Sequence, residues 1–407
     1  MRRLISTITG REYPFERLEE FADNDEALEV ALAGIERARP RPGRHLWERF
    51  AEFLPFKKMD ASVSLGEGNT PLMDAGERLG SFTGIERLLL KNETQNPTWS
   101  FKDRGSLACI FMAQEMSERA TTTISTGNMG HSIAAYGARA GLKAVVFVPE
   151  FAPREKLMAM TLHGATVIRV HGPDYALMKK AVLGLAKECN LRIVSGNGPI
   201  RAEGYKLTAF ELWEQMRGEL PDYVAVPTSA CGHIRGLFKG FRELAAAGLI
   251  PRPPRMIVVQ AANNSPIVSA IKQSAQHVIP FSNFHTVAEA ITTGNPMGGD
   301  EIIAKACQHG WLAEDVTEAE ILEAQRVLGQ AGWFVEPAAA TTLYAVRKLR
   351  AAGRIAAGES VLLMLTGAGL KDLAPLEQQP FHVVESSLDA VRRDLEHALL
   401  APAPAPR

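Results

Sequence analysis

Cysteine is scarce in this sequence, and its few cysteines are not paired along the chain. The 407 residues include only Cys109, Cys189, Cys231 and Cys307. Because no two of them form a Cys-x-x-Cys pair, their spacing supports neither a zinc site nor a redox dithiol nor a disulfide framework. We therefore expect a reduced protein without a bound metal.

Long apolar runs and an excess of one charge are missing as well. No apolar stretch approaches the roughly 18–20 residues that a membrane span needs, and residues 1–7 lack the apolar run of a signal peptide. The 45 basic and 46 acidic residues give a net charge of −1, without a basic block or an acidic tail. This balance argues against nucleic acid or a membrane as partner and predicts a soluble, cytoplasmic protein.

From about residue 86 onward, short apolar runs alternate with amphipathic stretches. The runs are rich in β-branched residues and are apolar on both faces, as in a sheet that helices cover on both sides. We predict strands at residues 87–91, 121–126, 144–149, 166–171, 192–195, 223–227, 256–261 and 360–366. We predict helices at residues 106–119, 132–140, 154–163, 176–189, 205–216, 235–247 and 317–329, the last opened by a capping box. Such alternation predicts a mostly parallel, doubly wound α/β sheet.

The two ends of the chain lack this alternation. Residues 26–37 have the composition of a helix and precede a stretch rich in proline and arginine at 39–44. After Asp372 the strand signals fade. Residues 384–400 predict a single helix, and the Ala-Pro repeat at 401–406 predicts a disordered tip.

The strongest chemical signal is the stretch Asn96-Pro97-Thr98-Trp99-Ser100-Phe101-Lys102-Asp103-Arg104-Gly105. It places Lys102 after a predicted strand and before a predicted helix, at the strand end where open α/β sheets bind ligands. A lysine there can form a Schiff base if burial and cationic neighbours lower its pKa. A bare Ser-x-Lys would more often be a surface lysine at a helix start, but the ten-residue context favours a reactive amine.

Two glycine-containing loops that follow predicted strands are suited to binding anions. They are Ser125-Thr126-Gly127-Asn128-Met129-Gly130 and Pro227-Thr228-Ser229-Ala230-Cys231-Gly232-His233. Small residues let backbone N–H groups approach an anion at a helix N-terminus, where the helix dipole also favours negative charge. Each loop alone would be an ordinary turn, and Cys231 is more simply a small buried residue than a nucleophile.

Together these stretches resemble the motifs of fold-type II pyridoxal-phosphate enzymes, and most closely those of threonine synthases. The lysine motif of that family reads Asn-Pro-Thr-Gly-Ser-Phe-Lys-Asp-Arg-Gly. Its closing motif, Leu-Thr-Gly-x-Gly-Leu-Lys-Asp, is similar to residues 365–372. Residues 65–72, 201–206, 294–296 and 334–338 match further family motifs, so that the resemblance extends over residues 45–372.

The resemblance implies a role for each matching residue. Lys102 would hold pyridoxal 5'-phosphate as a Schiff base and move protons, and Thr366 would face the pyridine nitrogen. A hydroxyl cannot keep that nitrogen protonated as a carboxylate would, so the ring becomes a weaker electron sink. The residues implied in cofactor binding are Phe101, Lys102, Asn128, Ser229, Ala230, Cys231, Gly232, His233 and Thr366. Those implied in substrate binding are Ser125, Thr126, Gly127, Met129 and Arg201.

The resemblance also implies an α/β fold of two doubly wound open-sheet domains with the active site between them. The larger domain would combine residues 61–102 and 191–375, the smaller one would span 103–190, and 376–407 would form a terminal helix and tip. Residues 1–60 would be an appendage, in which Ser6 and Thr9 stand where many threonine synthases have zinc-binding cysteines. A hydroxyl binds zinc poorly, so we expect a metal-free relic of a zinc ribbon. The family habit implies a homodimer.

The implied reaction is that of a carbon-oxygen lyase. Phosphate would be eliminated from O-phosphohomoserine, and water would add at Cβ to give threonine. Several residues depart from the family pattern, however: Trp99 replaces a glycine, Met129-Gly130-His131 replaces Thr-Ser-Ala or similar, Ser195-Gly196 replaces Asn-Ser, and Ala230 and His233 replace two asparagines. Lost polar contacts to a dianion would cost several kcal/mol unless other groups compensate.

These departures leave an alternative open. A threonine synthase paralogue could perform β-replacement or β-elimination on another small amino acid such as phosphoserine, in the manner of cysteate synthases or dehydratases. A relative that binds the cofactor without catalysis is disfavoured, because Lys102, Asn128 and Thr366 are all present.

Overall fold

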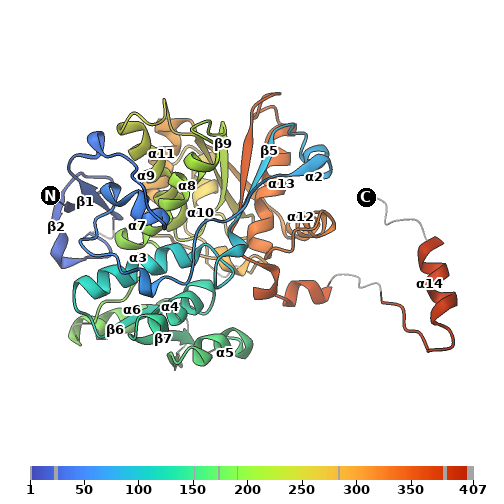
Figure 1. The fold of residues 1–407 in the computed structure, drawn as a ribbon, viewed down its shortest axis with the longest axis horizontal. Coiled ribbons are helices and arrows are strands. Elements are labelled where there is room, and N and C mark those ends of the chain that lie inside the picture. Colours follow the sequence, from blue (N-terminus) through green and yellow to red (C-terminus); the bar gives the residue numbers. More distant parts are fainter. Residues whose placement is uncertain are drawn as a thin grey trace. The chain divides into compact units, whose positions relative to one another are not determined.

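Three β-sheets organise the part of the chain from Met1 to Asp372 (Figure 1). The computed structural model describes residues 2–22, 26–150, 152–172, 175–189, 191–282, 285–378 and 383–400. The strand orders are β2-β1-β3, β11-β10-β9-β12-β5-β4 and β6-β7-β8. Residues from Leu373 to Arg407 form a separate unit.

The strands are β1 (Arg2–Ser6), β2 (Glu12–Pro14), β3 (Leu28–Leu32), β4 (Leu72–Asp74), β5 (Leu88–Asn92), β6 (Ala120–Ile124), β7 (Lys143–Pro149), β8 (Thr166–Val170), β9 (Tyr223–Pro227), β10 (Arg255–Ala261), β11 (Leu312–Val316) and β12 (Val361–Leu365). The α-helices are α1 (Leu46–Arg49), α2 (Gly76–Thr83), α3 (Lys102–Glu115), α4 (Asn128–Arg139), α5 (Arg154–Leu162), α6 (Tyr175–Glu188), α7 (Pro199–Tyr205), α8 (Leu207–Gln215), α9 (Gly232–Ala246), α10 (Pro266–Lys272), α11 (Gly299–His309), α12 (Glu318–Gln330), α13 (Pro337–Ala351) and α14 (Val391–Leu400). Short 3-10 helices are η1 (Phe15–Arg17), η2 (Ile35–Arg37), η3 (Ala51–Phe53), η4 (Ala61–Val63), η5 (Glu93–Gln95), η6 (Glu289–Ile291), η7 (Gly369–Lys371) and η8 (Ala374–Gln378).

The six-stranded sheet is parallel except for its edge strand β4. Successive residues of β9 face different cores, since Val224 packs with one hydrophobic cluster and Ala225 with the other. Helices α8 and α9 cover the first face, and α12 and α13 cover the second (Figure 1). A strand buried on both faces must be apolar throughout, which is why the continuous apolar runs predicted this doubly wound α/β sheet correctly.

The sheet β6-β7-β8 is also parallel and lies among α3, α4, α5 and α6. Its strands all come from residues 103–190, whereas the six-stranded sheet draws on 61–102 and 191–375. The domain boundaries themselves stay a prediction. The predicted strand at 192–195 is wrong, because only Ile193 makes a single bridge to Thr122 before the chain turns into α7 at Pro199.

The predicted helix at residues 26–37 is also wrong. Leu28–Leu32 is strand β3, in which Val30 pairs with Leu4 of β1. Leu28 and Val30 are both buried, and this spacing of two places them on one face of a strand. Packing on the rest of the protein therefore overrides a composition that favours a helix.

Other predicted elements are placed correctly but differ at their ends. Helix α3 begins at Lys102 instead of at residue 106, and residues 205–216 divide between α7 and α8. In the separate C-terminal unit, the predicted helix at 384–400 is present only as α14. The predicted tip at 401–406 lies outside the described residues.

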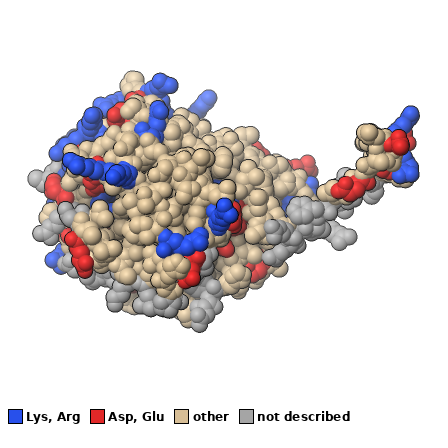
Figure 2. Space-filling model, turned by 90° about the horizontal axis from the view of Figure 1, so that it is seen from below, with Lys and Arg blue, Asp and Glu red and all other residues tan. Residues whose placement is uncertain are grey.

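The surface carries charges of both signs. Acidic and basic side chains are scattered over the face in Figure 2, and wide areas of that face carry neither. Within the described ranges, no helix combines the length and the apolar character needed to cross a membrane.

Helices α3 and α7 approach each other closely at Gly204. A Cβ added there would overlap the carbonyl oxygen of Arg104, which is backbone and cannot rotate away. We expect Gly204→Ala to lower the free energy of unfolding by about 2 kcal/mol or more through overpacking. Denaturant unfolding followed by circular dichroism measures this change.

Gly329→Ala in α12 is the matched control. An added Cβ there meets nothing within 4 Å, so alanine should raise the free energy of unfolding by about 0.5–1 kcal/mol through its better helix propensity. A similar effect of both substitutions would contradict the close approach of α3 and α7.

Candidate active site

The carboxyl ends of four strands bring the predicted motifs together. The lysine stretch follows β5, Thr366 follows β12, the loop 228–231 follows β9, and the loop 125–127 follows β6. The backbone N–H of Phe101 donates to the carbonyl of Thr366 at 3.0 Å, and Ser100 pairs with Gly367. The lysine stretch and the closing motif that contains Thr366 are far apart in the sequence but are therefore neighbours in space.

Lys102 begins α3 and is half-buried. Loss of hydration, with the nearby positive charge of Arg201, lowers the pKa of its amine to about 7, although the Glu336 carboxylate acts in the opposite direction. Its Nζ lies 4.4 Å from the centroid of the Phe101 ring. An amine with this pKa is partly neutral at neutral pH and is thus a usable nucleophile and proton carrier.

A buried network of charges fixes the backbone next to Lys102. The Arg104 guanidinium donates to the carboxylates of Glu93 at 2.7 Å and Glu211 at 2.9 Å. Glu211 also pairs with Lys91 of β5 at 2.5 Å. All four charged groups are buried, so each depends on its partners for the interactions that water would otherwise supply.

Asn128 contacts a carboxylate that the sequence reasoning did not assign to the site. Its Nδ2 donates to Oε2 of Glu336 at 2.9 Å. Glu336 is buried at the start of α13, and burial raises the pKa of its carboxyl group. A Cβ on Gly367 would lie 2.5 Å from this carboxylate, so the glycine leaves room for it. The signal that could have identified Glu336 is its place in a matched motif just before a helix-starting proline.

The loop after β9 is closely packed at the N-terminus of α9. Cys231 adopts a left-handed conformation with φ of 71°, and a Cβ on Gly232 would overlap the carbonyl oxygen of Gly196. Burial raises the pKa of the Cys231 thiol well above its usual range. This supports the interpretation of Cys231 as a packed small residue instead of a nucleophile.

His233 supplies a polar group that lacks a protein partner. Its ring stacks on Phe101 with centroids 3.9 Å apart, and burial lowers its pKa to about 3. Neither ring nitrogen of His233 nor Oγ of Ser100 has a hydrogen-bond partner among the described residues. Buried unpartnered groups beside a helix N-terminus fit a ligand with a phosphate group, such as the pyridoxal phosphate implied by the resemblance.

Arg201 of α7 is fully buried. Its Nε donates to the carbonyl of Ser195 at 3.0 Å, and its Nη1 donates to Oγ of Ser106 at 3.3 Å. Its Nη2 has no hydrogen-bond partner within the part of the chain that the structure describes. An anion contact for Arg201 thus stays a prediction that the geometry permits.

The N-terminal appendage also contacts the segment around Ser195, and the sequence did not predict this contact. The carboxylate of Glu20 accepts the backbone N–H of Ser195 at 2.9 Å, and a Cβ on Gly198 would overlap it. Elsewhere in the appendage, the hydroxyls of Ser6 and Thr9 both donate to the Glu26 carboxylate. No local sequence pattern links Glu20 to a loop 175 residues away.

The remaining predicted residues lie around the same strand ends. Ser125, Thr126, Gly127 and Met129 are half-buried where α4 begins, and Thr366 is buried. Ser229 and Ala230 are half-buried before α9. Their roles in cofactor and substrate binding stay predictions.

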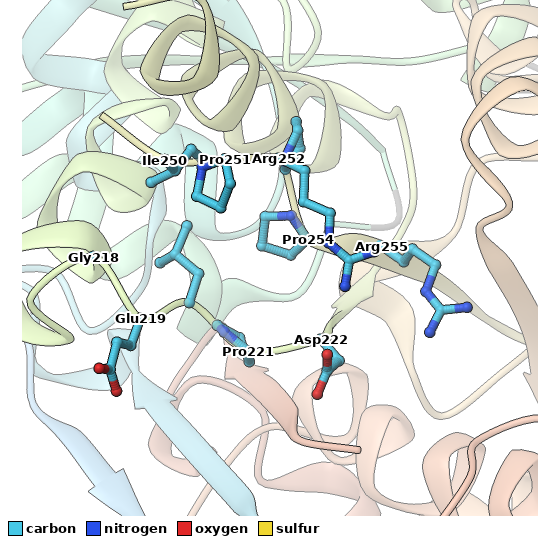
Figure 3. A pocket seen from close by; sticks show the side chains of 11 residues that line it. Gly218, Glu219, Pro221, Asp222, Ile250, Pro251, Arg252, Pro254 and Arg255 are labelled. Carbon is cyan, nitrogen blue, oxygen red and sulfur yellow. The ribbon is translucent and has the colours of Figure 1, made fainter. Parts of the chain in front are cut away.

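A separate surface cavity of about 280 Å³ lies at the opposite, amino-terminal end of the strands of the six-stranded sheet (Figure 3). Its lining includes Asp222, Arg252 and Arg255, at the amino ends of β9 and β10. Lys102 follows the carboxyl end of β5, so this cavity is distinct from the candidate active site.

Comparison with known proteins agrees with this geometry. A family model described as pyridoxal-phosphate dependent enzyme matches residues 63–367. A threonine synthase of Methanocaldococcus jannaschii is 40% identical over 327 residues, covering 80% of each chain. One from Methanosarcina acetivorans is 36% identical, covering 84% of this chain and 85% of the relative.

Solved structures share the fold at lower identity. Threonine deaminase isoform 2 of Solanum lycopersicum superposes with a TM-score of 0.66 at 19% identity, covering 84% of this chain and 95% of that one. Serine racemase of Dictyostelium discoideum gives a TM-score of 0.61 at 24% identity, covering 74% and 92%. At these identities the likeness concerns the fold alone.

Substitution of Glu336 tests the geometry around Asn128 and Lys102. The Glu336 charge raises the pKa of Lys102, so Glu336→Gln should lower it. The neutral amine is the reactive form, and the rate at which the apoprotein captures pyridoxal phosphate should therefore reach its midpoint at a lower pH. Absorbance spectroscopy across a pH series measures this shift.

Glu336→Ala should in addition weaken cofactor binding about tenfold, because Asn128 loses a buried hydrogen-bond partner. Glu77→Gln, at an exposed position on α2, is the control and should change neither quantity. An unchanged midpoint in Glu336→Gln would contradict an electrostatic contact between Glu336 and Lys102.

Proposed function

The chain belongs to the pyridoxal-phosphate-dependent enzymes and, within them, to the threonine synthase family, and on this basis we propose that it converts O-phosphohomoserine to threonine. Family membership makes it a pyridoxal-phosphate-dependent lyase. The reaction proposed here eliminates phosphate and adds water at Cβ. The observation that carries the proposal is the amine of Lys102, with a pKa of about 7, where the lysine, glycine and closing motifs meet.

When bound, pyridoxal phosphate supplies an electron sink for the charge released at the substrate's Cα. Lys102 would be joined to it covalently. Backbone N–H groups of the loop from Ser229 to His233 would hold its phosphate, and Asn128 would hold its hydroxyl group. The hydrogen bond from Asn128 to Glu336 fixes the orientation of the Asn128 amide.

Proton transfer falls to Lys102. With a pKa near 7, its amine can both take up and give back a proton at neutral pH, at Cα and at the neighbouring carbons. The Glu336 carboxylate favours the protonated form, and burial with Arg201 favours the neutral form. These opposed effects keep the amine close to balance between its two forms.

A second function has a specific observation in its favour. The family pattern is altered at Trp99, Gly196 and Ala230, although Lys102, Asn128 and Thr366 are kept. A paralogue that carries out β-replacement or β-elimination on another small amino acid, such as phosphoserine, would show this combination. In either case we propose a cytoplasmic homodimer.

Incubation of the purified, cofactor-loaded protein with O-phosphohomoserine tests the main proposal. We expect equal amounts of threonine and released phosphate, detected by chromatography and a phosphate assay. Lys102→Ala should lower the rate by at least about a thousandfold, since it removes both the covalent link and the proton carrier.

Borohydride reduction followed by peptide mapping is the control for cofactor attachment. The reduced cofactor should remain as a covalent label on Lys102. Absence of threonine, together with a spectral change on adding phosphoserine, would favour the paralogue. Absence of label on Lys102 would contradict both functions.

A further inference from the structure

A cluster of aromatic and basic side chains lies beside the proposed site and has no role in the mechanism above. We call Trp99, His131, His163 and Lys371 the Trp99 cluster. Trp99 precedes Lys102 by three residues, and His131 follows Asn128 by three, which places it on the same side of α4. Trp99 and His131 are both departures from the family pattern, and the structure brings them together.

Direct contacts join the members of the cluster. The Trp99 and His131 rings meet edge to face with centroids 6.1 Å apart, and His131 stacks on His163 at 5.4 Å. Nζ of Lys371 lies 3.0 Å from Nδ1 of His131 and donates to the carbonyl of Thr98 at 2.7 Å. Burial, with the charge of Lys371, lowers the pKa of His131 to about 3, so its ring is neutral at neutral pH.

Trp99 is held in a conformation that is unfavourable for its residue type. Its φ is +63°, in the left-handed region that costs a non-glycine residue about 1 kcal/mol or more. Half of its surface is exposed, so burial of the ring does little to offset this cost. Its backbone is fixed by hydrogen bonds with Asn96 and Ala368. A large exposed ring in a strained position next to the reactive lysine indicates a functional role.

Lys371 is a cation that forms no salt bridge within the described residues, although the charges of Glu336 and Asp103 raise its pKa against the effect of burial. No carboxylate lies within 4.0 Å of its Nζ among the described residues, and burial lowers its pKa to about 8. The nearest acids are already engaged, Glu336 by Asn128 and Asp103 by Thr98 and Ser132. Asp372, which follows Lys371, faces Lys156 at 4.0 Å.

The cluster therefore has hydrogen-bond donors available for an anion. Because Lys371 donates to Nδ1 of the neutral His131 ring, the proton of that ring is on Nε2. Nε2–H of His131 and the third N–H of Lys371 have no acceptor within the described ranges. One cationic and one neutral donor, beside an aromatic ring that limits access of water, suit a phosphate group.

We propose that the Trp99 cluster binds the phosphate ester of a phosphorylated amino-acid substrate. This inference rests on the proposed function. Met129 and Gly196 stand where the family pattern has polar residues. His131, a further departure from that pattern, adds a hydrogen-bond donor beside Lys371 of the closing motif, and the two together bind the phosphate. The substrate then spans from Lys102 at its Cα to Lys371 at its phosphate.

Titration of the cofactor-loaded protein with inorganic phosphate tests this inference. Tryptophan fluorescence should change with phosphate, and Trp99→Phe should abolish the change while phosphate still inhibits turnover. Lys371→Met should weaken phosphate binding about tenfold or more, as loss of a charge-assisted hydrogen bond predicts. It should raise KM for O-phosphohomoserine similarly, with the cofactor absorption band and the melting temperature unchanged.

Lys143→Met removes an exposed lysine from β7 and is the matched control, expected to leave phosphate binding unchanged. Equal phosphate affinity in the wild type and Lys371→Met would overturn the inference. So would loss of phosphate binding in Arg201→Met alone, or no binding by the wild type at millimolar concentration. Failure to make threonine would refute the proposed function alone, because phosphate binding is measured without turnover.

Discussion

The site depends on the buried ion network beneath the lysine loop. Arg104 is two residues from Lys102 and joins Glu93, just after β5, to Glu211 of α8. Such a network adds little net stability, since desolvation opposes the attraction between charges, but removing one partner leaves a charge buried and unpaired. The network therefore acts as a constraint on geometry. It fixes where α3 starts, and with it where the amine of Lys102 lies.

Carboxylates connect this fixed lysine to the rest of the site. Glu336 holds Asn128 and influences the pKa of both Lys102 and Lys371. Glu20 holds the backbone of Ser195, whose carbonyl binds Arg201. The N-terminal appendage thus contributes to the wall of the candidate active site.

The altered residues lie both beside the proposed substrate site, as Trp99 and His131 do, and in the loop proposed to hold the cofactor phosphate, as Ala230 and His233 do. The groups suited to the cofactor, namely a lysine with a lowered pKa, a glycine-containing loop and a buried neutral histidine, lie at the ends of rigid strands. Trp99 lies on the segment between β5 and α3, and His131 lies in the first turn of α4. At such positions beside the site a new side chain changes the pocket without disturbing the cores. Cofactor chemistry can therefore be kept while the preference for the substrate changes.

Local sequence pattern was sufficient to predict the parallel sheets, because a strand buried on both faces is apolar throughout. It was also sufficient to identify the motifs, because the residues of each motif are consecutive in the sequence. It failed at residues 26–37 and 192–195, where pairing with β1 and the turn into α7 decide the backbone. The partners Glu336 and Asn128 are 208 residues apart, and Trp99 before α3 meets His131 of α4. Contacts of this kind exist only after the sheets have assembled, since no short-range periodicity specifies which loops meet.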